Sequence, residues 1–174
     1  NPNLSNIELL PRLIAYCSEE SEMYVKKIAD LLFVQLRILP TDETYSLQGE
    51  TVKTAVINDI SQGLVPIFLC VNFGTVSSTA IDDLAQIGPL CKKYKIWCHV
   101  DASYGGCSLL CEEMRPLCKG LEFADSFNTD ADKWCLAHDG VSCLWVKDRK
   151  KYCSAFMTAS PYPKPEDVNL LYNR

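Results

Sequence analysis

The sequence has little of what marks zinc-binding, membrane-spanning or nucleic-acid-binding proteins. Its ten cysteines contain no Cys-x-x-Cys pair and only two histidines could complete a metal site, so we expect no zinc. Its longest apolar stretch, Leu64 to Phe73, is about half of what spans a bilayer and contains Pro66. The 17 Lys and Arg against 22 Asp and Glu leave a net charge of −5, which argues against binding to nucleic acid or to an anionic membrane surface.

What the chain does contain is typical of a globular protein that carries free thiols. Its 174 residues, of which 48% are apolar and 22% charged, suffice for one domain with a sizeable core. Cys70, Cys98 and Cys143 lie inside apolar runs, where a free cysteine packs as a small hydrophobic residue. We therefore favour reduced thiols in a cytoplasmic protein over a disulfide-bonded alternative. No charged-then-apolar leader is present and the chain begins at Asn1, so we expect no signal peptide and a piece of a longer protein.

Apolar residues follow strand and helix periodicities in alternation along the chain. The strand pattern predicts strands at 13–16, 34–39, 66–73, 96–100, 124–128 and 141–146. The helical pattern predicts helices at about 19–33, 52–63 and 81–94, and a short one at 109–114. Strands that alternate with helices predict an α/β fold, in which a mainly parallel sheet is flanked by helices.

Three local features refine the predicted helices. Ser18, followed by acidic residues, is a candidate N-cap for the first long helix. Val52, Val56 and Ile60 form one apolar stripe, which we expect to be buried along the second. Pro89 lies inside the third, where a missing N–H and the proline ring predict a kink or a break.

Polar residues follow the ends of several predicted strands. In mainly parallel sheets, ligands bind outside the carboxyl ends of the strands, which draws attention to Gly74-Thr75, to Asp101 and to the segment after Asn128. Lys133 follows the strand after Asp101, so that the two charges can meet across a cleft. From spacing alone, a plain ion pair is favoured over a catalytic pair, because buried charges are usually paired and few are catalytic.

Longer motifs resemble one family of enzymes. They are Gly74-Thr75, HVDASYGG at 99–106, GLEFADSFN at 120–128, DKW at 132–134 and LWVKDR at 144–149. Together they resemble the group II pyridoxal-phosphate-dependent decarboxylases, most closely those that act on aromatic L-amino acids and on histidine. The aspartate at a strand end and the later Lys-Trp are specific only in combination. The similarity covers nearly the whole chain, although subunits of this family are much longer.

The resemblance implies a fold, a reaction and partners. Residues 1–159 would form part of the large, pyridoxal-phosphate-binding domain of the fold type I, aspartate-aminotransferase-like enzymes. Residues 160–174, which begin a proline-rich exposed loop, resemble the start of the family's mobile catalytic loop. Pyridoxal 5'-phosphate is the implied cofactor, and decarboxylation of an aromatic L-amino acid or histidine to the amine and CO2 is the implied reaction. The implied assembly is a homodimer with the active site at its interface.

The resemblance also implies roles for four residues. Lys133 would form the Schiff base with the cofactor aldehyde. Asp101 would pair with the pyridinium nitrogen and keep it protonated, so that the ring acts as an electron sink. Ser103 would lie against the ring face, where the family carries a small residue. Tyr162 falls at the distance of the loop tyrosine that returns a proton to the substrate carbon, and a loop tyrosine without that role fits the position equally well.

Four positions depart from the family pattern. Glu22 stands where the family has a ring-stacking histidine, and Val76 where it has a threonine. Asp130 and Asp132 stand where an asparagine and a histidine lie near the cofactor phosphate. Like charges ~4 Å apart cost about 4 kcal/mol at an effective dielectric of roughly 20, so these acids predict weak cofactor binding. The alternative to an active decarboxylase is therefore a catalytically impaired or truncated relative that serves as a fold or dimerisation partner. A third alternative, a generic α/β binding domain, would require the combined motifs to be coincidental.

Overall fold

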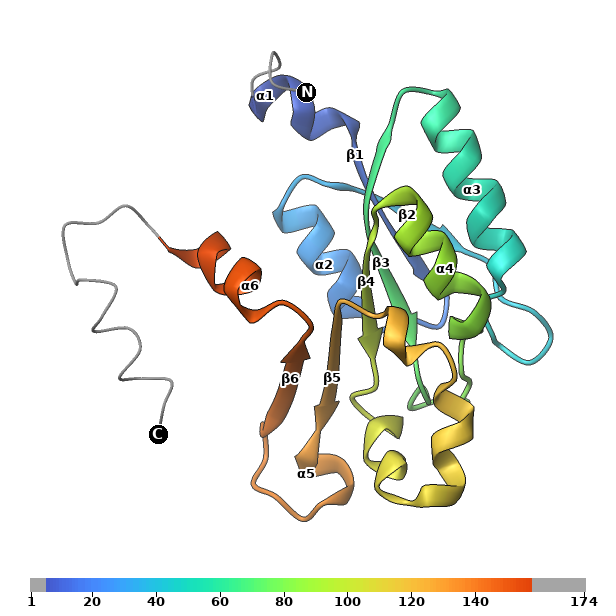
Figure 1. Cartoon of the computed structure of the whole chain (residues 1–174), viewed down its shortest axis with the longest axis vertical. Coiled ribbons are helices and arrows are strands. Elements are labelled where there is room, and N and C mark those ends of the chain that lie inside the picture. The colour runs from blue at the N-terminus through green and yellow to red at the C-terminus, as the bar shows by residue number, and fades with distance from the viewer. Residues whose placement is uncertain (1–5, 158–174) are drawn as a thin grey trace.

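A computed structural model of the chain describes residues 6–157 and contains one six-stranded sheet (Figure 1). The strand order is β2-β1-β3-β4-β5-β6. The strands are β1 (Leu13–Ser18), β2 (Gln35–Leu39), β3 (Val65–Asn72), β4 (Trp97–Asp101), β5 (Ser126–Asp130) and β6 (Ser142–Val146). All neighbours pair in parallel except β5 and β6, which are antiparallel. The predicted α/β class with a mainly parallel sheet is confirmed.

Helices lie on both faces of this sheet. They are α1 (Asn6–Leu9), α2 (Met23–Leu31), α3 (Gly49–Ser61), α4 (Leu84–Tyr94), α5 (Ala131–Trp134) and α6 (Arg149–Phe156). Four 3-10 turns complete the described part, at Leu10–Arg12, Gly105–Leu110, Glu112–Cys118 and Leu121–Phe123. No helix in residues 6–157 combines the length and the apolar character needed to cross a bilayer.

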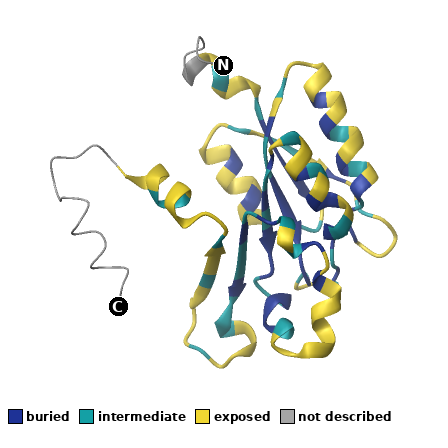
Figure 2. Cartoon of the chain, viewed as in Figure 1, coloured by how far each residue is buried: buried dark blue, intermediate teal, exposed yellow. Residues whose placement is uncertain are grey.

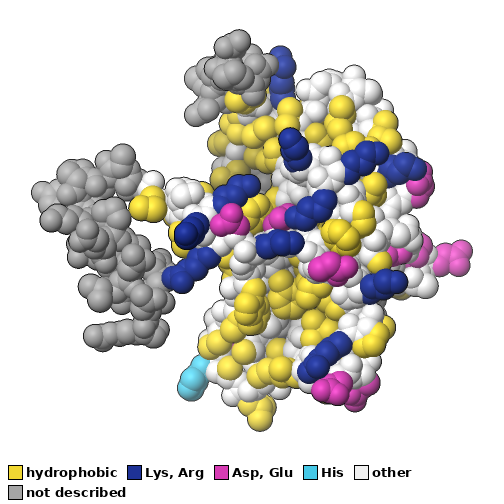
Figure 3. Space-filling view, in the orientation of Figure 1, with side chains coloured by type: hydrophobic (Ala, Val, Ile, Leu, Met, Phe, Trp, Pro, Cys, Tyr) yellow, Lys and Arg dark blue, Asp and Glu magenta, His cyan; other side chains and the backbone are white. Residues whose placement is uncertain are grey.

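The two faces of the sheet differ in how fully they are covered. Because side chains alternate along a strand, Tyr16 and Leu69 pack in the larger core with α3 and α4, whereas Cys17 and Cys70 pack on the opposite face with Val25 of α2. Figure 2 shows the dark-blue buried residues concentrated in the central strands, while β6 and α6 are largely exposed. On the face seen in Figure 3, apolar side chains lie exposed between charged ones. The central strands are therefore the best-buried part of the fold, and a site at their ends has a packed core beneath it.

The local helix predictions need three corrections. Ser18 is not an N-cap: it ends β1, its hydroxyl accepts a hydrogen bond from Asn72 Nδ2 at 2.7 Å, and α2 begins only at Met23. Pro89 does not break α4, which continues from Leu84 to Tyr94 because a cap at each end and buried side chains along its length stabilise it. The short helix predicted at 109–114 is replaced by 3-10 turns.

The predicted apolar stripe of α3 is also partly wrong. Val52 and Val56 are fully buried, but Ile60 is 44% exposed and its neighbour Asp59 is buried instead. The carboxylate of Asp59 faces the sheet because Tyr16 and Arg37 donate hydrogen bonds to it. A polar partner set, rather than apolar periodicity, thus decides which side of this helix turn faces inward.

Candidate active site

The carboxyl ends of β3, β4 and β5 meet at one edge of the sheet, where Asp101 is the last residue of β4. In register, Asp101 lies between Asn72 of β3 and Asn128 of β5. It is only 5% exposed, and both of its carboxylate oxygens accept hydrogen bonds. Oδ1 accepts from the backbone N–H of Ser103 at 3.0 Å, and Oδ2 accepts from the hydroxyl of Tyr24 at 2.5 Å.

Tyr24 belongs to the first turn of α2 and was missed by the sequence analysis. Its ring reaches the end of β4 although 77 residues separate it from Asp101. Burial, together with the nearby Asp101 carboxylate, raises the pKa of Tyr24. The phenol therefore stays protonated and acts as a donor. No motif marks Tyr24 in the sequence, because its role depends on where α2 lies over the sheet.

A cavity of about 10 Å³ lies beside Asp101. It is lined by Glu20, Glu22, Asn72, Gly74, Thr75, Val76, Asp101, Ser103 and Tyr104. Four of the predicted site residues, namely Glu22, Val76, Asp101 and Ser103, are thus brought together. The cavity has room for about one water molecule, so that any larger ligand requires a side chain to move.

Glycines allow the loops after β3 and β4 to touch. A Cβ added to Gly105 would lie 2.6 Å from the carbonyl oxygen of Phe73 and 2.7 Å from the Cα of Gly74. Gly105 N–H donates to the carbonyl oxygen of Gly74 at 3.1 Å. Gly74 itself has a φ of 72°, which an L side chain adopts only with strain. This close approach closes one wall of the cavity.

Lys133 lies on α5, one turn after β5, and its partner is Asp132. Lys133 Nζ is 3.7 Å from Asp132 Oδ1, and the lysine side chain is 43% exposed. The other oxygen of Asp132 accepts the N–H of Gly140 at 2.8 Å, whereas Oδ1 is buried without a hydrogen bond. Lys133 therefore forms an ion pair, as spacing favoured, but among the described residues its partner is Asp132 and not Asp101 across the cleft.

A backbone hydrogen bond connects the segment of Lys133 to that of Asp101. The N–H of Asp130 donates to the carbonyl oxygen of Ser103 at 3.0 Å, at the point where β5 ends and α5 begins. Asp130 consequently ends the strand next to Asp101, and Asp132 and Lys133 follow it on α5, although none of the three lines the 10 Å³ cavity. Tyr162 lies outside the described residues.

Two further groups near Asp101 were not singled out from the sequence. Glu20 accepts hydrogen bonds from Ser78 Oγ at 3.2 Å and from Ser77 Oγ at 3.4 Å, which places a second acid beside Glu22 on the cavity wall. His99, two residues before Asp101 on β4, stacks on Phe68 with ring centroids 6.0 Å apart. Burial lowers the pKa of His99, which keeps the imidazole neutral beneath the site.

Comparisons with known proteins point to one family. A sequence model described as the pyridoxal-dependent decarboxylase conserved domain matches residues 1–173. Mouse histidine decarboxylase is 39% identical over 155 residues, which are 89% of this chain and 23% of that protein. A probable aromatic-L-amino-acid decarboxylase of Caenorhabditis elegans is 40% identical over 160 residues, which are 91% of this chain and 18% of that protein.

Solved structures with the same fold belong to related enzymes. Oryza sativa TDC, crystallised with PLP and tryptamine, superposes with a TM-score of 0.87 at 28% identity, over 94% of this chain and 34% of that one. Catharanthus roseus tryptophan decarboxylase in complex with L-tryptophan gives a TM-score of 0.83 at 30% identity, over 87% of this chain and 34% of that one. The chain therefore spans about a third or less of the proteins it matches.

Proposed function

Since this chain belongs to the pyridoxal-dependent decarboxylase family, we propose that it is the central part of the cofactor domain of an amino-acid decarboxylase. The relatives named above favour an aromatic L-amino acid or histidine as substrate, with the amine and CO2 as products. The proposal also includes a homodimer in the cytoplasm. Residues 1–159 would belong to the large domain, and Tyr162 would be the proton donor on the loop at 160–174. The observation that carries it is the position of Asp101 and Lys133 after neighbouring parallel strands.

The chemistry of the donor set fits two of the three groups that pyridoxal phosphate presents. Lys133 carries a primary amine for the aldehyde, and Asp101 carries a buried carboxylate for the ring nitrogen. Ser103, on the cavity wall, would flank a ring that pairs with Asp101, whereas Glu22 on the same wall stands where the family has a stacking histidine. When bound, the cofactor supplies an electron sink for the bond to the substrate carboxyl group that breaks.

The residues of this chain would act by holding charge and protons in place. The backbone N–H of Ser103 fixes one oxygen of Asp101, so that the buried carboxylate has a defined orientation. Asp132 Oδ1 lies 3.7 Å from Lys133 Nζ and holds the amine beside the end of β5, and an amine must be unprotonated to react with an aldehyde. His99, whose pKa is lowered by burial, stacks on Phe68 two residues before Asp101 and adds no positive charge to the site.

The residues expected near the third group of the cofactor, its phosphate, favour a second candidate function. Asp130 ends β5 and Asp132 lies on α5, where the family pattern has an asparagine and a histidine. Asp132 Oδ1 is buried without a hydrogen bond, and Lys133 Nζ lies 3.7 Å away. A carboxylate repels a phosphate dianion, and proton uptake relieves only part of this repulsion. A decarboxylase-like protein that retains the fold as a dimerisation or regulatory partner, with little turnover, is therefore the alternative.

Covalent trapping separates the two functions. We expect incubation with pyridoxal phosphate followed by borohydride to label Lys133, as read by peptide mass mapping, and Lys133→Ala to abolish the label. Lys53→Ala is the matched control, because its side chain is 45% exposed and paired with a neighbouring acid, as that of Lys133 is. An intact, cooperatively unfolding chain without a label at Lys133 would contradict the enzymatic proposal and support the alternative.

A further inference from the structure

The hydroxyl of Tyr24 donates a hydrogen bond to Oδ2 of Asp101, the carboxylate that the proposed function assigns to the ring nitrogen. We propose that Tyr24 competes with the cofactor ring for Asp101, so that its hydroxyl determines how tightly this chain holds the cofactor. The proposal rests on the proposed function, because it assumes that Asp101 is the acceptor for the ring nitrogen. It concerns a side chain of α2 that lies outside every motif of the family resemblance.

The geometry of Asp101 leaves little room for another donor. Ser103 N–H holds Oδ1 at 3.0 Å, and Tyr24 O–H holds Oδ2 at 2.5 Å. A hydrogen bond of that length to a carboxylate is of the charge-assisted kind, which is about twice as strong as a neutral one. A protonated ring nitrogen would have to approach within about 2.7–2.9 Å of the same oxygen. Each carboxylate oxygen can accept two hydrogen bonds, but Asp101 is only 5% exposed and the cavity beside it has about 10 Å³. The hydroxyl and the ring nitrogen therefore compete for the same limited space at Oδ2.

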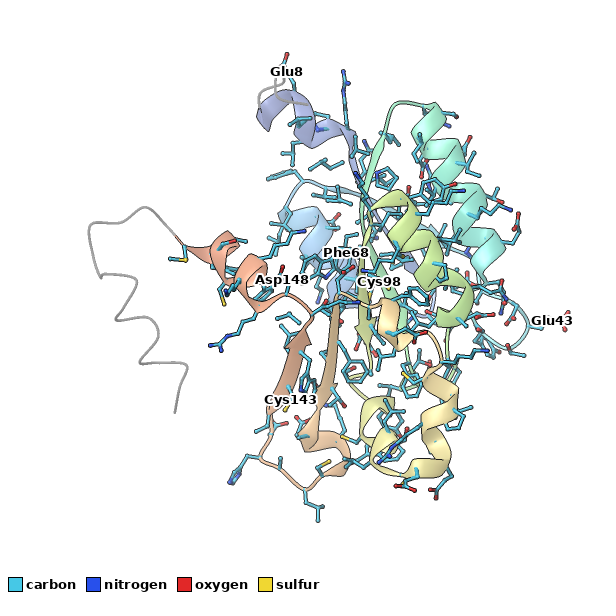
Figure 4. All side chains as sticks on the ribbon, viewed as in Figure 1. Glu8, Glu43, Phe68, Cys98, Cys143 and Asp148 are labelled. Atoms are coloured by element: carbon cyan, nitrogen blue, oxygen red, sulfur yellow. The ribbon has the colours of Figure 1, made fainter. Side chains whose placement is uncertain are left out.

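The hydrogen bond from Tyr24 to Asp101 lies between two cavities of very different size on the same face of the sheet. Asp101 lines the cavity of about 10 Å³, whereas Tyr24 lines an apolar cavity of about 250 Å³ between α2 and the strands. The walls of the larger cavity include Ile28, Leu32 and Phe68, the last of which is labelled in Figure 4. An aromatic ring is compatible with such walls. Tyr24 can thus withdraw from Asp101 into existing space, and its withdrawal would enlarge the small cavity.

The alternative role for Tyr24, support of cofactor binding, predicts the opposite change in affinity when the hydroxyl is removed. If the hydroxyl held Asp101 in the orientation that the ring nitrogen needs, its removal would weaken binding. If the hydroxyl competes, its removal frees Oδ2 and strengthens binding. Tyr24→Phe keeps the ring and deletes only the oxygen, so that the sign of the change in affinity decides between the two roles.

The experiment measures the binding of pyridoxamine 5'-phosphate to the 174-residue chain by quenching of tryptophan fluorescence. This probe has the ring nitrogen and the phosphate but no aldehyde, so that its affinity is independent of covalent attachment to Lys133. We expect Tyr24→Phe to lower its Kd by about tenfold or more, the effect of one hydrogen bond to a charged group. Tyr152→Phe, which alters a tyrosine of α6 that packs on Phe156, should leave the Kd unchanged.

A second ligand tests whether Tyr24 competes with the ring nitrogen in particular. Benzyl phosphate has an aromatic ring and a phosphate but no ring nitrogen, so Tyr24→Phe should not improve its binding. Three outcomes would each overturn the proposal. Tyr24→Phe could improve the binding of both ligands equally, or it could leave the Kd for pyridoxamine phosphate unchanged or raise it. The third is that neither the original chain nor Tyr24→Phe binds either ligand. Tight binding by Tyr24→Phe without a trapped label at Lys133 would support the role of Tyr24 and contradict the proposed function, so the two failures are distinguishable.

Discussion

The guanidinium of Arg37 on β2 donates hydrogen bonds to both carboxylate oxygens of Asp59 on α3. The distances are 2.8 Å from Nε to Oδ2 and 2.5 Å from Nη2 to Oδ1, and the Asp59 side chain is fully buried. Tyr16 of β1 donates to the same carboxylate at 2.9 Å. Two strands and the helix that covers them are therefore joined through one buried anion.

Replacing Arg37 should destabilise the chain strongly. In Arg37→Leu the Asp59 carboxylate remains buried with only the Tyr16 hydroxyl as partner, and removing one member of such a pair costs about 3–5 kcal/mol. The free energy of unfolding in urea measures this change. Lys53→Leu, which breaks the exposed pair with Glu50, should cost at most about 1 kcal/mol. The double variant Arg37→Leu, Asp59→Leu should regain much of the loss, and equal losses in Arg37→Leu and Lys53→Leu would refute the explanation.

The sequence predicts the apolar elements of this fold far better than its buried polar contacts. The strands at 66–73 and 96–100 are continuous apolar runs, as expected of parallel strands covered on both faces, so their positions follow from composition alone. Asp59 and Tyr24, by contrast, acquire their roles from partners 22 to 77 residues away. Single-sequence periodicity carries no information on such partners. The position of Asp101 at a strand end was predictable for the opposite reason, since an abrupt change from apolar to charged residues marks it locally.

Gly105 should be intolerant of any side chain because it touches the loop after β3. Gly105→Ala would place a Cβ 2.6 Å from a backbone oxygen, which requires the two loops to separate. We expect a loss of about 1–3 kcal/mol in the free energy of unfolding and faster amide hydrogen exchange at 74–80. Gly63→Ala is the control: its Cβ meets nothing within 4 Å, and its φ of 81° brings backbone strain alone. Unchanged exchange at 74–80 in Gly105→Ala would show that the contact does not hold the site closed.

Asp82 should make the stability of the chain decrease as pH rises from about 4 to 6. Burial raises the pKa of Asp82 from 3.8 to about 6, although the N–H groups of Leu47 and Asn72 oppose this shift. The carboxyl group of Asp82 binds its proton more tightly in the folded state than in the unfolded state. Its contribution to stability is therefore complete below the pKa of the unfolded state and is lost as pH rises through the pKa of the folded state. A shift of this size corresponds to roughly 3 kcal/mol.

Urea unfolding at several pH values tests this contribution. Asp82→Asn cannot titrate, so the difference in unfolding free energy between it and the original chain should change by about that amount between pH 4 and pH 7. Asp83→Asn is the matched control, since it removes the adjacent carboxylate, which caps α4, but leaves Asp82 in place, so the pH-dependent step assigned to Asp82 should persist in it. A constant difference between Asp82→Asn and the original chain across this range would exclude the raised pKa.

Restoring the family pattern after β5 should increase the affinity for pyridoxal phosphate. In the double variant Asp130→Asn, Asp132→His, two negative charges are removed beside Lys133, one of which lies 3.7 Å from its Nζ. Less repulsion of the phosphate favours the bound cofactor, and we expect the Kd to fall by about tenfold or more. Asp139→Asn, in the exposed turn before β6, removes a charge without altering these positions and should have little effect. An unchanged or higher Kd for the double variant, measured by fluorescence quenching, would mean that these carboxylates do not face the phosphate. Weak binding would then have to originate at Glu22 or Tyr24 instead.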